Sequence, residues 1–236
     1  MNLILLSVDD LVSPTQARLR DERRVQHILN IHKAGVDDQL KVGLINGLIG
    51  TASITAIYPG EIELAVDLQH APPAPLPLTL VLALPRPKML KRILQNCATL
   101  GIKDIVLINS YRVEKSYWQT PILEANSIRD HLLLGLEQGG DTQMPQVRLA
   151  KRFKPFVEDE LPGLIQDSRA LVAHPYTDTA CPRQIDGRVT LAFGPEGGFI
   201  SYEIDLLMRC GFEAVHVGER ILRVDTAIPF IISRLF

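Results

Sequence analysis

Apolar residues near the start of the chain recur first with the period of a helix and then alternate as they do in strands. Within residues 21–33, Val25, Ile28 and Leu29 share one helical face and Gly35 follows, which predicts a helix that ends there. An Asn-Gly pair, which is a strong hairpin signal, and a Pro-Gly pair separate the alternating runs beyond it. These runs predict three strands, at residues 40–45, 48–57 and 61–68.

A proline-rich run follows the last of these strands: four prolines stand within six residues, at Pro72, Pro73, Pro75 and Pro77. Such a run favours an extended, semi-rigid connector. We therefore predict a small β-barrel-like domain over residues 1–70, a linker over residues 71–78 and a second domain over residues 79–236.

Beyond the linker, strand-like and helix-like segments alternate, which is typical of a mostly parallel sheet covered by helices. The predicted class is therefore α/β. Pro87 stands at the tolerated first position of a helix that ends at Gly101, and further helices are predicted over much of residues 121–138 and at residues 202–210. The predicted strands are residues 79–84, 104–108, 169–174, 188–193 and 212–217.

Composition narrows the class of protein. The chain has 236 residues, of which 46% are hydrophobic and 22% charged, as in ordinary globular proteins. Its apolar runs are far shorter than the ~20 residues of a membrane-spanning helix, and its apolar start lacks a basic leader, so we expect a cytoplasmic protein without a membrane partner. Its three cysteines, at positions 97, 181 and 210, lack the spacing of a zinc site or a disulfide framework, so we expect reduced thiols and no metal.

Charge is distributed unevenly along the chain. Twenty-five basic and 27 acidic side chains give a net charge of −2, which argues against coating nucleic acid by bulk electrostatics. Residues 86–115, however, hold seven bases against two acids, and residues 18–33 hold five against two. These stretches either bind a phosphate backbone or are ordinary solvated helix faces.

Candidate ligand-binding loops follow three of the predicted strands, because ligands of a parallel sheet bind beyond the carboxyl ends of its strands. The loops begin at His174-Pro175, at Gly194 and at Gly218. Neither a Gly-x-Gly-x-x-Gly fingerprint nor a P-loop occurs, so dehydrogenase and P-loop functions lose their main support.

The middle loop is rich in glycine. Gly194, Gly197 and Gly198 lack a Cβ, so their backbone can take a positive φ and approach a ligand closely; a tight strand-to-helix turn is the alternative. Pro195 stiffens this loop, and Glu196 can bond a ligand hydroxyl or amine, or cap the following helix.

The last loop leads into a predicted C-terminal helix. Asp225 is predicted as its N-cap, with Pro229 in or near the first turn, so Arg223 would lie just outside the helix N-terminus. The Arg223 guanidinium and the helix N-terminus both carry positive charge, which favours an anionic group between them. The alternative is a salt bridge of Arg220 or Arg223 to a neighbouring acid.

Together these segments resemble the ribosomal RNA small subunit methyltransferase E family, which belongs to the knotted SPOUT methyltransferases. Weaker likeness covers nearly the whole chain, including Arg24 with His27-Ile28 in the N-terminal domain. The motifs that carry the resemblance are Gly194-Pro195-Glu196-Gly197-Gly198-Phe199, Glu203-Ile204, Gly211-Phe212, Val217-Gly218-Glu219-Arg220-Ile221-Leu222-Arg223 and Asp225-Thr226-Ala227.

The resemblance implies a C-terminal trefoil-knot domain, a PUA-like RNA-binding β-barrel at the N-terminus, and a homodimer. It implies methylation of N3 of a uridine in 16S ribosomal RNA of the small subunit, with S-adenosylmethionine as cofactor. The residues implied to hold the cofactor are His174, Pro175, Gly194, Pro195, Glu196, Gly197, Gly198, Val217, Gly218, Ile221 and Leu222. Those expected at the RNA are Arg24, His27, Arg86, Lys88, Arg92 and Arg112.

Arg223 and Asp225 are the candidate catalytic residues. Arginine beside the base would favour the anionic uracil, and the carboxylate would orient the arginine or accept the N3 proton. The family usually shows Arg-Thr-Glu-Thr-Ala where this chain has Val224 and Asp225 at the second and third positions. Two alternatives therefore stay open: a non-catalytic RNA-binding or ribosome-assembly protein that keeps the knot, or a SPOUT methyltransferase for another RNA base. A third, an unrelated α/β hydrolase, lacks the Gly-x-Ser-x-Gly nucleophile motif.

Overall fold

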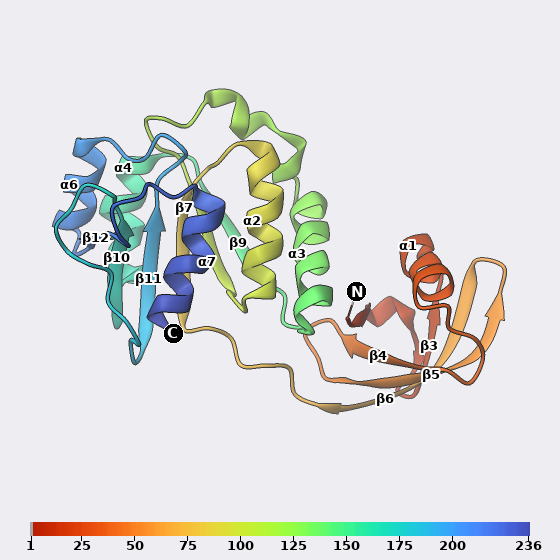
Figure 1. Ribbon diagram of the computed structural model, residues 1–236. Coiled ribbons are helices and arrows are strands. Elements are labelled where there is room, and N and C mark those ends of the chain that lie inside the picture. Colours follow the sequence, from red (N-terminus) through yellow and green to blue (C-terminus); the bar gives the residue numbers. More distant parts are fainter. Residues whose placement is uncertain (1) are drawn as a thin grey trace. The chain divides into compact units, whose positions relative to one another are not determined.

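The computed structural model describes residues 2–236, which form two compact units (Figure 1). The first unit contains the residues up to Ala74 together with Leu133–Met144, and the second contains Pro75–Leu132 and Pro145–Phe236. The division after Ala74 falls inside the proline-rich run. The sequence pattern does not predict that residues 133–144 belong to the first unit. These residues are the end of a helix, α3 (Ala125–Gly139), and the turn after it.

The first unit is built on a curled six-stranded sheet in the order β1-β4-β5-β6-β3-β2. β1 pairs with β4 in parallel, and the remaining pairs are antiparallel. The three strands predicted from alternation are present as β4, β5 and β6, whereas β1, β2 and β3 were not predicted because three or four residues are too few to show a period. The strands are β1 (Ile4–Leu6), β2 (Leu11–Ser13), β3 (Gln16–Leu19), β4 (Gln39–Leu44), β5 (Ile49–Tyr58) and β6 (Glu61–His70).

A helix packs its apolar face on this sheet. α1 (Glu22–Gln26) begins after Asp21, whose side chain accepts a hydrogen bond from the Arg24 amide, and continues as a π-helical turn, η2 (His27–Ile31). Val25 and Ile28 are buried in the core of the unit together with apolar residues of β1, β3, β4, β5 and β6. The predicted helix at residues 21–33 is thus confirmed.

A largely buried ion pair connects this helix to Asp10. The Arg24 guanidinium donates to both carboxylate oxygens of Asp10, at 2.7 and 3.0 Å, and to the Leu5 carbonyl oxygen at 2.8 Å. The two side chains are only 14% and 9% exposed. Burial alone would raise the pKa of Asp10, but hydrogen bonds from Arg24 and Ser7 outweigh it and hold that pKa below its ordinary value. Arg24 is therefore occupied by groups of its own unit.

Arg24→Ala is expected to lower the free energy of unfolding by about 3 kcal/mol, because it leaves the Asp10 carboxylate buried without its partner. Arg20→Ala is the matched control: Arg20 bonds Glu61 but is 68% exposed, so its loss is expected to cost less than about 1 kcal/mol. Urea denaturation of the full chain measures both changes. Equal destabilisation by the two substitutions would show that the buried Arg24–Asp10 pair contributes no more to the free energy of unfolding than the exposed Arg20–Glu61 pair.

The second unit is built on a six-stranded parallel sheet in the order β12-β10-β11-β7-β8-β9. Strand β7 is buried along its whole length, as expected for a strand covered on both faces. The α/β class and the parallel sheet predicted from the sequence are confirmed. The strands are β7 (Leu78–Ala83), β8 (Asp104–Ile108), β9 (Gln146–Ala150), β10 (Ser168–Ala173), β11 (Arg188–Phe193) and β12 (Glu213–Val215).

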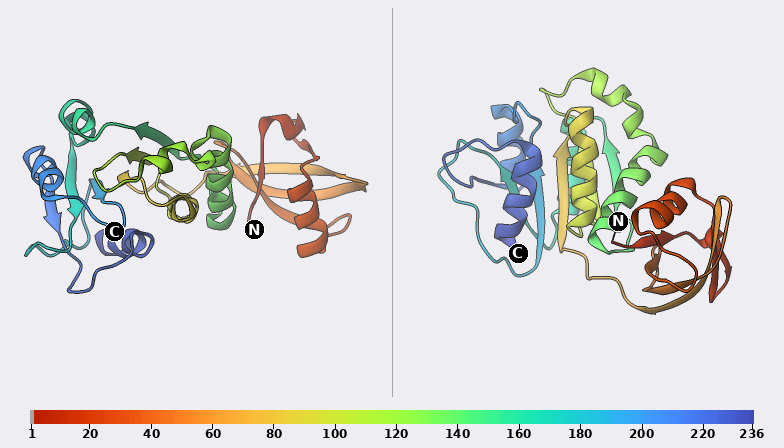
Figure 2. Two further views of the ribbon diagram at one scale, coloured as in Figure 1. Left: turned by 90° about the horizontal axis from the view of Figure 1, so that it is seen from above. Right: turned by 45° about the vertical axis from the view of Figure 1, so that its right-hand side comes forward.

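Helices cover both faces of this sheet (Figure 2). α2 and α7 lie on one face, and the short helical turns around α4 and α5 lie on the other. α2 begins at Pro87 as predicted, and its apolar side, including Leu90, Ile93 and Cys97, is buried. The helical segments not yet given are η1 (Val8–Asp10), α2 (Pro87–Thr99), η3 (Lys115–Gln119), η4 (Pro121–Leu123), α4 (Phe153–Pro155), η5 (Phe156–Glu160), α5 (Leu161–Leu164), α6 (Ser201–Arg209) and α7 (Val224–Leu235).

Two further properties concern residues 2–236 as a whole. Over this range, no helix has the length and apolar character needed to cross a membrane. The three cysteines are free thiols, and burial raises the pKa of Cys97 to about 12, so it stays protonated in the core.

Candidate cofactor and RNA site

The three loops that the sequence singles out lie at neighbouring positions along one edge of the parallel sheet. β10 is hydrogen-bonded to both β11 and β12, so the segments that leave the carboxyl ends of these strands emerge side by side. They begin at His174, Gly194 and His216. Parallel sheets bind their ligands at this edge.

The loop after β11 is a compact glycine turn. The Gly198 amide donates to the Pro195 carbonyl at 2.7 Å, and Gly198 takes a φ of +71°. A Cβ on Gly194 would lie 2.7 Å from the Phe199 amide nitrogen, so this position is closed to any side chain. Of the three glycines, positive φ therefore occurs only at Gly198, and Gly194 is required for close packing of the turn instead.

Two side chains tie this turn to the neighbouring strands. Glu196 accepts a hydrogen bond from the Arg86 amide at 3.0 Å, and the Arg112 guanidinium donates to the Gly197 carbonyl. Arg86 is the N-cap of α2, so Glu196 bonds that helix start and not the start of the helix that follows it in the chain. The turn is thereby fixed against the loops that leave β7 and β8.

The side chain of Glu203, which has no role assigned from the sequence, also helps to hold these loops in place. Glu203 is 3% exposed and accepts hydrogen bonds from the Tyr111 amide at 2.7 Å and from the Ile200 amide at 3.0 Å. It thus joins the loop after β8 to the start of α6. The helix begins at Ser201, one residue before the predicted range of 202–210, with Ile200 as its N-cap, because Glu203 supplies the capping acceptor from within the first turn.

The flanking loops present backbone and apolar groups. The His174 amide donates to the Val215 carbonyl at 2.9 Å, its ring meets Tyr176, and burial lowers the pKa of His174, which favours the neutral ring. Gly218 has a φ of +134°, which a glycine adopts without strain. Ile221 is largely exposed, Val217 and Leu222 are half-buried, and Pro175 is exposed.

Arg223 and Asp225 lie at the start of α7. Arg223 is the N-cap, and Asp225 is the second residue of the helix, which corrects the expectation that Asp225 caps it. The helix begins early because the Arg223 carbonyl already accepts from the amides of Thr226 and Ala227. Pro229 is consequently deeper in the helix than predicted, where its missing N–H leaves the Asp225 carbonyl without an intrahelical donor.

The two side chains form a weak pair. Arg223 Nε lies 3.5 Å from Asp225 Oδ1, with Arg223 69% and Asp225 15% exposed. Asp225 Oδ1 is itself buried and accepts no hydrogen bond within the described chain. A guanidinium open to solvent thus stands at a helix N-terminus beside a carboxylate oxygen with spare capacity, an arrangement suited to an anionic ligand and to proton transfer.

The residues expected at the RNA divide between the two units. Arg86, Lys88, Arg92 and Arg112 are exposed in the second unit, and Arg86 and Arg112 reach the glycine turn as described above. Arg24 and His27 belong to the first unit. His27 packs its ring against that of His32, and burial lowers the pKa of His27.

A third group of basic residues, beyond the stretches at residues 18–33 and 86–115, was not identified from the sequence. Lys151 and Arg152 are exposed and follow β9, so they extend the basic edge of the sheet beyond the loops that leave β7 and β8. β9 was not predicted as a strand, because it is an edge strand exposed on both faces and lacks the apolar run of its neighbours. The density of bases at residues 148–154 was the available signal.

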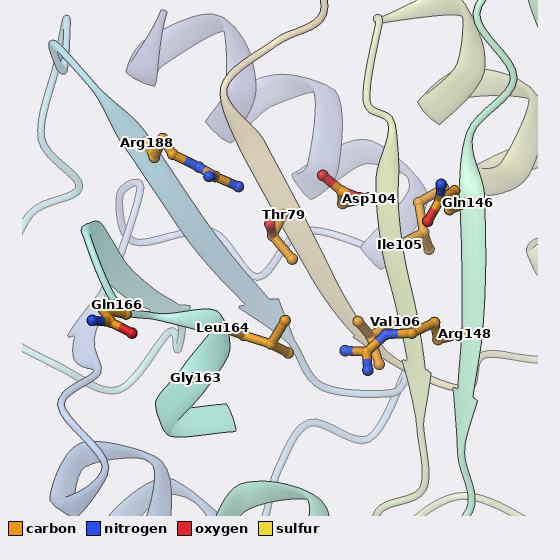
Figure 3. A pocket seen from close by; sticks show the side chains of 10 residues that line it. All are labelled: Thr79, Asp104, Ile105, Val106, Gln146, Arg148, Gly163, Leu164, Gln166 and Arg188. Carbon is orange, nitrogen blue, oxygen red and sulfur yellow. The ribbon is translucent and has the colours of Figure 1, made fainter. Parts of the chain in front are cut away.

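A hollow of about 200 Å³ lies at the opposite, amino-terminal ends of the strands (Figure 3). Thr79, Asp104, Gln146 and Arg188, near the starts of four strands, line it together with Arg148. None of the predicted site residues lines this hollow. The described residues also contain no group of three or more His, Cys, Asp or Glu side chains that could hold a metal ion.

Solved structures share this architecture. Ribosomal RNA small subunit methyltransferase E from Neisseria gonorrhoeae, bound to S-adenosyl methionine, is 20% identical, with a TM-score of 0.73 over 98% of this chain and 96% of that one. A Legionella pneumophila protein described as a methyltransferase, in complex with the bound cofactor SAM, is 22% identical, with a TM-score of 0.72 over 96% and 93%. The fold is therefore a mixed α/β methyltransferase fold with one curled and one parallel sheet.

The chain belongs to the RNA methyltransferase domain family, whose sequence model matches residues 72–236. It is also similar to ribosomal RNA small subunit methyltransferase E from Treponema pallidum, with 29% identity over 236 residues, 96% of this chain and 87% of that protein. The family resemblance inferred from the glycine turn and the C-terminal motif is confirmed.

Proposed function

We propose that this protein transfers the methyl group of S-adenosylmethionine to N3 of a uridine in 16S ribosomal RNA of the small subunit. The observation that carries the proposal is the convergence of three loops with Arg223 and Asp225 at one edge of the parallel sheet. The family, the ribosomal RNA methyltransferase name of the relatives and the S-adenosylmethionine held by the two solved neighbours support it.

The chemistry of the loops fits the cofactor. Gly194, Gly198 and Gly218 let the backbone approach an adenosine without interference from side chains, and Ile221 and Leu222 offer apolar surface to its base. Asp225 Oδ1 is buried and, within residues 2–236, accepts no hydrogen bond, although Arg223 Nε lies 3.5 Å away, so it retains capacity for a ligand. His174, Pro175, Pro195, Glu196, Gly197 and Val217 complete the proposed binding residues.

The protein's own residues would align the acceptor and remove its proton. Bound S-adenosylmethionine supplies an activated methyl group on its sulfonium. Uracil N3 is a poor nucleophile while it carries its proton, so Arg223, aided by the N-terminus of α7, would stabilise the anionic base. Asp225 would orient Arg223 and accept the proton at Oδ1, which accepts no hydrogen bond within the described residues.

Arg86, Lys88 and Arg92 are proposed to hold RNA phosphates. Their joint replacement by glutamate is expected to weaken binding to small-subunit RNA more than about 10-fold and to reduce the slope of log affinity against log salt by about two to three, since each of the three lost phosphate contacts removes roughly 0.7–0.9. Arg188→Glu, at the amino end of β11, is the control and is expected to leave the slope unchanged. A triple variant with the wild-type slope would exclude these residues from the interface.

We further propose the N-terminal domain type, the knot and the subunit arrangement that the resemblance implies. The first unit would be a PUA-like RNA-binding domain of a cytoplasmic homodimer. A trefoil knot in the second unit is proposed from the resemblance, and the end of α7 contacts the segment after β10, where the amides of Gln184 and Ile185 donate to the Arg234 and Leu235 carbonyls. Exposed Phe230 on α7 supports a partner subunit at that helix.

Methyl transfer from labelled S-adenosylmethionine to small subunits purified from a strain that lacks this protein tests the proposal. Nuclease digestion and mass spectrometry then identify the base. A 3-methyluridine is the expected product. Methylation of another base would favour the alternative RNA target, and tight cofactor binding without transfer would favour the non-catalytic assembly protein.

A further inference from the structure

Tyr111 is an aromatic side chain that the proposed chemistry leaves without a role. It stands in the loop after β8, at the carboxyl-terminal edge of the parallel sheet, and it is 79% exposed. Exposure of a whole aromatic ring loses the free energy that its burial would give, so a structural role for the ring is a poor explanation.

The backbone that carries this ring is held firmly. The Tyr111 amide donates to buried Glu203, and the Val113 amide closes a turn onto the Ser110 carbonyl at 3.1 Å. The Asn109 side chain accepts a hydrogen bond from the Trp118 indole at 2.9 Å. Tyr111 is thus presented from a braced turn, which lowers the conformational entropy that the ring would lose on binding a ligand.

The same bracing sets the backbone of Tyr111 beside the proposed methyl-transfer site. Arg112, the next residue, donates to the Gly197 carbonyl, and Glu203 joins the Tyr111 amide to the segment that leaves the glycine turn. A ligand in contact with Tyr111 therefore lies close to the proposed cofactor loop.

Basic residues follow the strands on either side of this position. Arg86 follows β7, and Lys151 and Arg152 follow β9, the two strands that flank β8 in the sheet. Proteins that bind single-stranded nucleic acid combine an exposed aromatic ring with nearby basic side chains. The ring stacks on a nucleobase of any kind, and the basic side chains bind the phosphates.

We propose that the Tyr111 ring stacks on a base of the RNA next to the uridine that is methylated, so that it positions the single-stranded segment over the glycine turn. This inference rests on the proposed function, since it takes the RNA as the substrate. Tyr111 is a positioning residue here and takes no part in the proton or methyl transfer.

The first test separates RNA binding from cofactor binding. Tyr111→Ala is expected to raise the KM for unmethylated small subunits about 10-fold, with kcat and the Kd for S-adenosylmethionine changed less than about 2-fold, because the loss of one stacked base weakens RNA binding and leaves the cofactor loops unchanged. Tyr111→Phe keeps the ring and is expected to behave as the wild type. Tyr111→Leu keeps apolar bulk without a π face and is expected to resemble the alanine variant.

Three results would overturn the inference: an unchanged KM in Tyr111→Ala, failure of phenylalanine to restore it, or a loss confined to cofactor affinity. The last would assign the ring to the cofactor. Thermal melts of the variants show whether the fold is intact.

A second measurement does not need turnover. Tyr111→Trp adds an indole whose fluorescence is expected to be quenched by a short single-stranded oligouridylate and not by the same length of double-stranded RNA. Quenching in a protein that transfers no methyl group would reject the proposed function and keep the stacking surface. Absence of quenching while the oligouridylate binds, as measured by anisotropy of a labelled strand, would reject the stacking surface itself.

Discussion

Arg223→Ala is expected to lower the rate constant for methyl transfer by about 100-fold or more, with the affinity for S-adenosylmethionine nearly unchanged. Removal of one group that stabilises developing negative charge in an active site has effects of this size. Arg223 is suited to that task because its side chain is exposed at the N-terminus of α7 and paired with Asp225 only at 3.5 Å. Single-turnover kinetics with saturating small subunits, together with calorimetry of cofactor binding, measure the two quantities.

Arg223→Lys is the matched variant because it keeps the charge and loses the planar guanidinium. It is expected to retain more activity than alanine and to show a steeper rise of rate with pH, since a weaker stabilisation of the uracil anion leaves more of the base protonated. An Arg223→Ala enzyme with wild-type kcat would remove the guanidinium from the mechanism. A loss of cofactor affinity in proportion to the loss of rate would instead place Arg223 on the cofactor.

Gly194→Ala is expected to weaken S-adenosylmethionine binding by about 100-fold or more. A Cβ at this position would lie 2.7 Å from the Phe199 nitrogen and 2.9 Å from the Gly198 carbonyl carbon, and both are backbone atoms that no rotamer change can move. The glycine turn must therefore open, which moves the backbone groups proposed to hold the cofactor. A misplacement of about 1 Å costs roughly two orders of magnitude in reaction rate, and we expect a comparable loss of cofactor affinity here.

Gly163→Ala is the control for this substitution. Gly163 lies in α5, and among the described residues no atom beyond its chain neighbours and its own helix backbone is within 4 Å of the position that its Cβ would occupy, so the same chemical change is expected to leave cofactor affinity as it was. Calorimetric titration of both variants measures the effect, and a thermal melt shows that each is folded. Equal affinities in the two variants would mean that the geometry of the glycine turn does not determine cofactor binding.

Much of the second unit could be predicted because its signals are local. Pro87 and Gly101 bracket α2, and the continuous apolar run of β7 is typical of a strand buried on both faces. The three candidate loops were found from glycines and prolines after such strands. Their closeness in space follows from the parallel strand order, which a sequence pattern alone does not specify.

Other features depend on contacts between distant residues, and local patterns do not show them. The carboxylate of Glu203 is buried and bonds Tyr111, 92 positions away. Asp225 has the preferences of an N-cap, but α7 begins at Val224 because the Arg223 carbonyl already accepts the first helical hydrogen bonds. In the sequence, Arg24 is one more basic residue of a basic stretch. Only the fold shows that Asp10 and Leu5 accept hydrogen bonds from its guanidinium.

A crystal structure of the protein soaked with S-adenosylmethionine tests the central claim most directly. We expect density for the cofactor among residues 174–175, 194–198 and 217–222, with its methyl group directed toward Arg223. Density at another place, such as the hollow at the amino ends of the strands, or a fully occupied cofactor that does not contact the glycine turn, would contradict it.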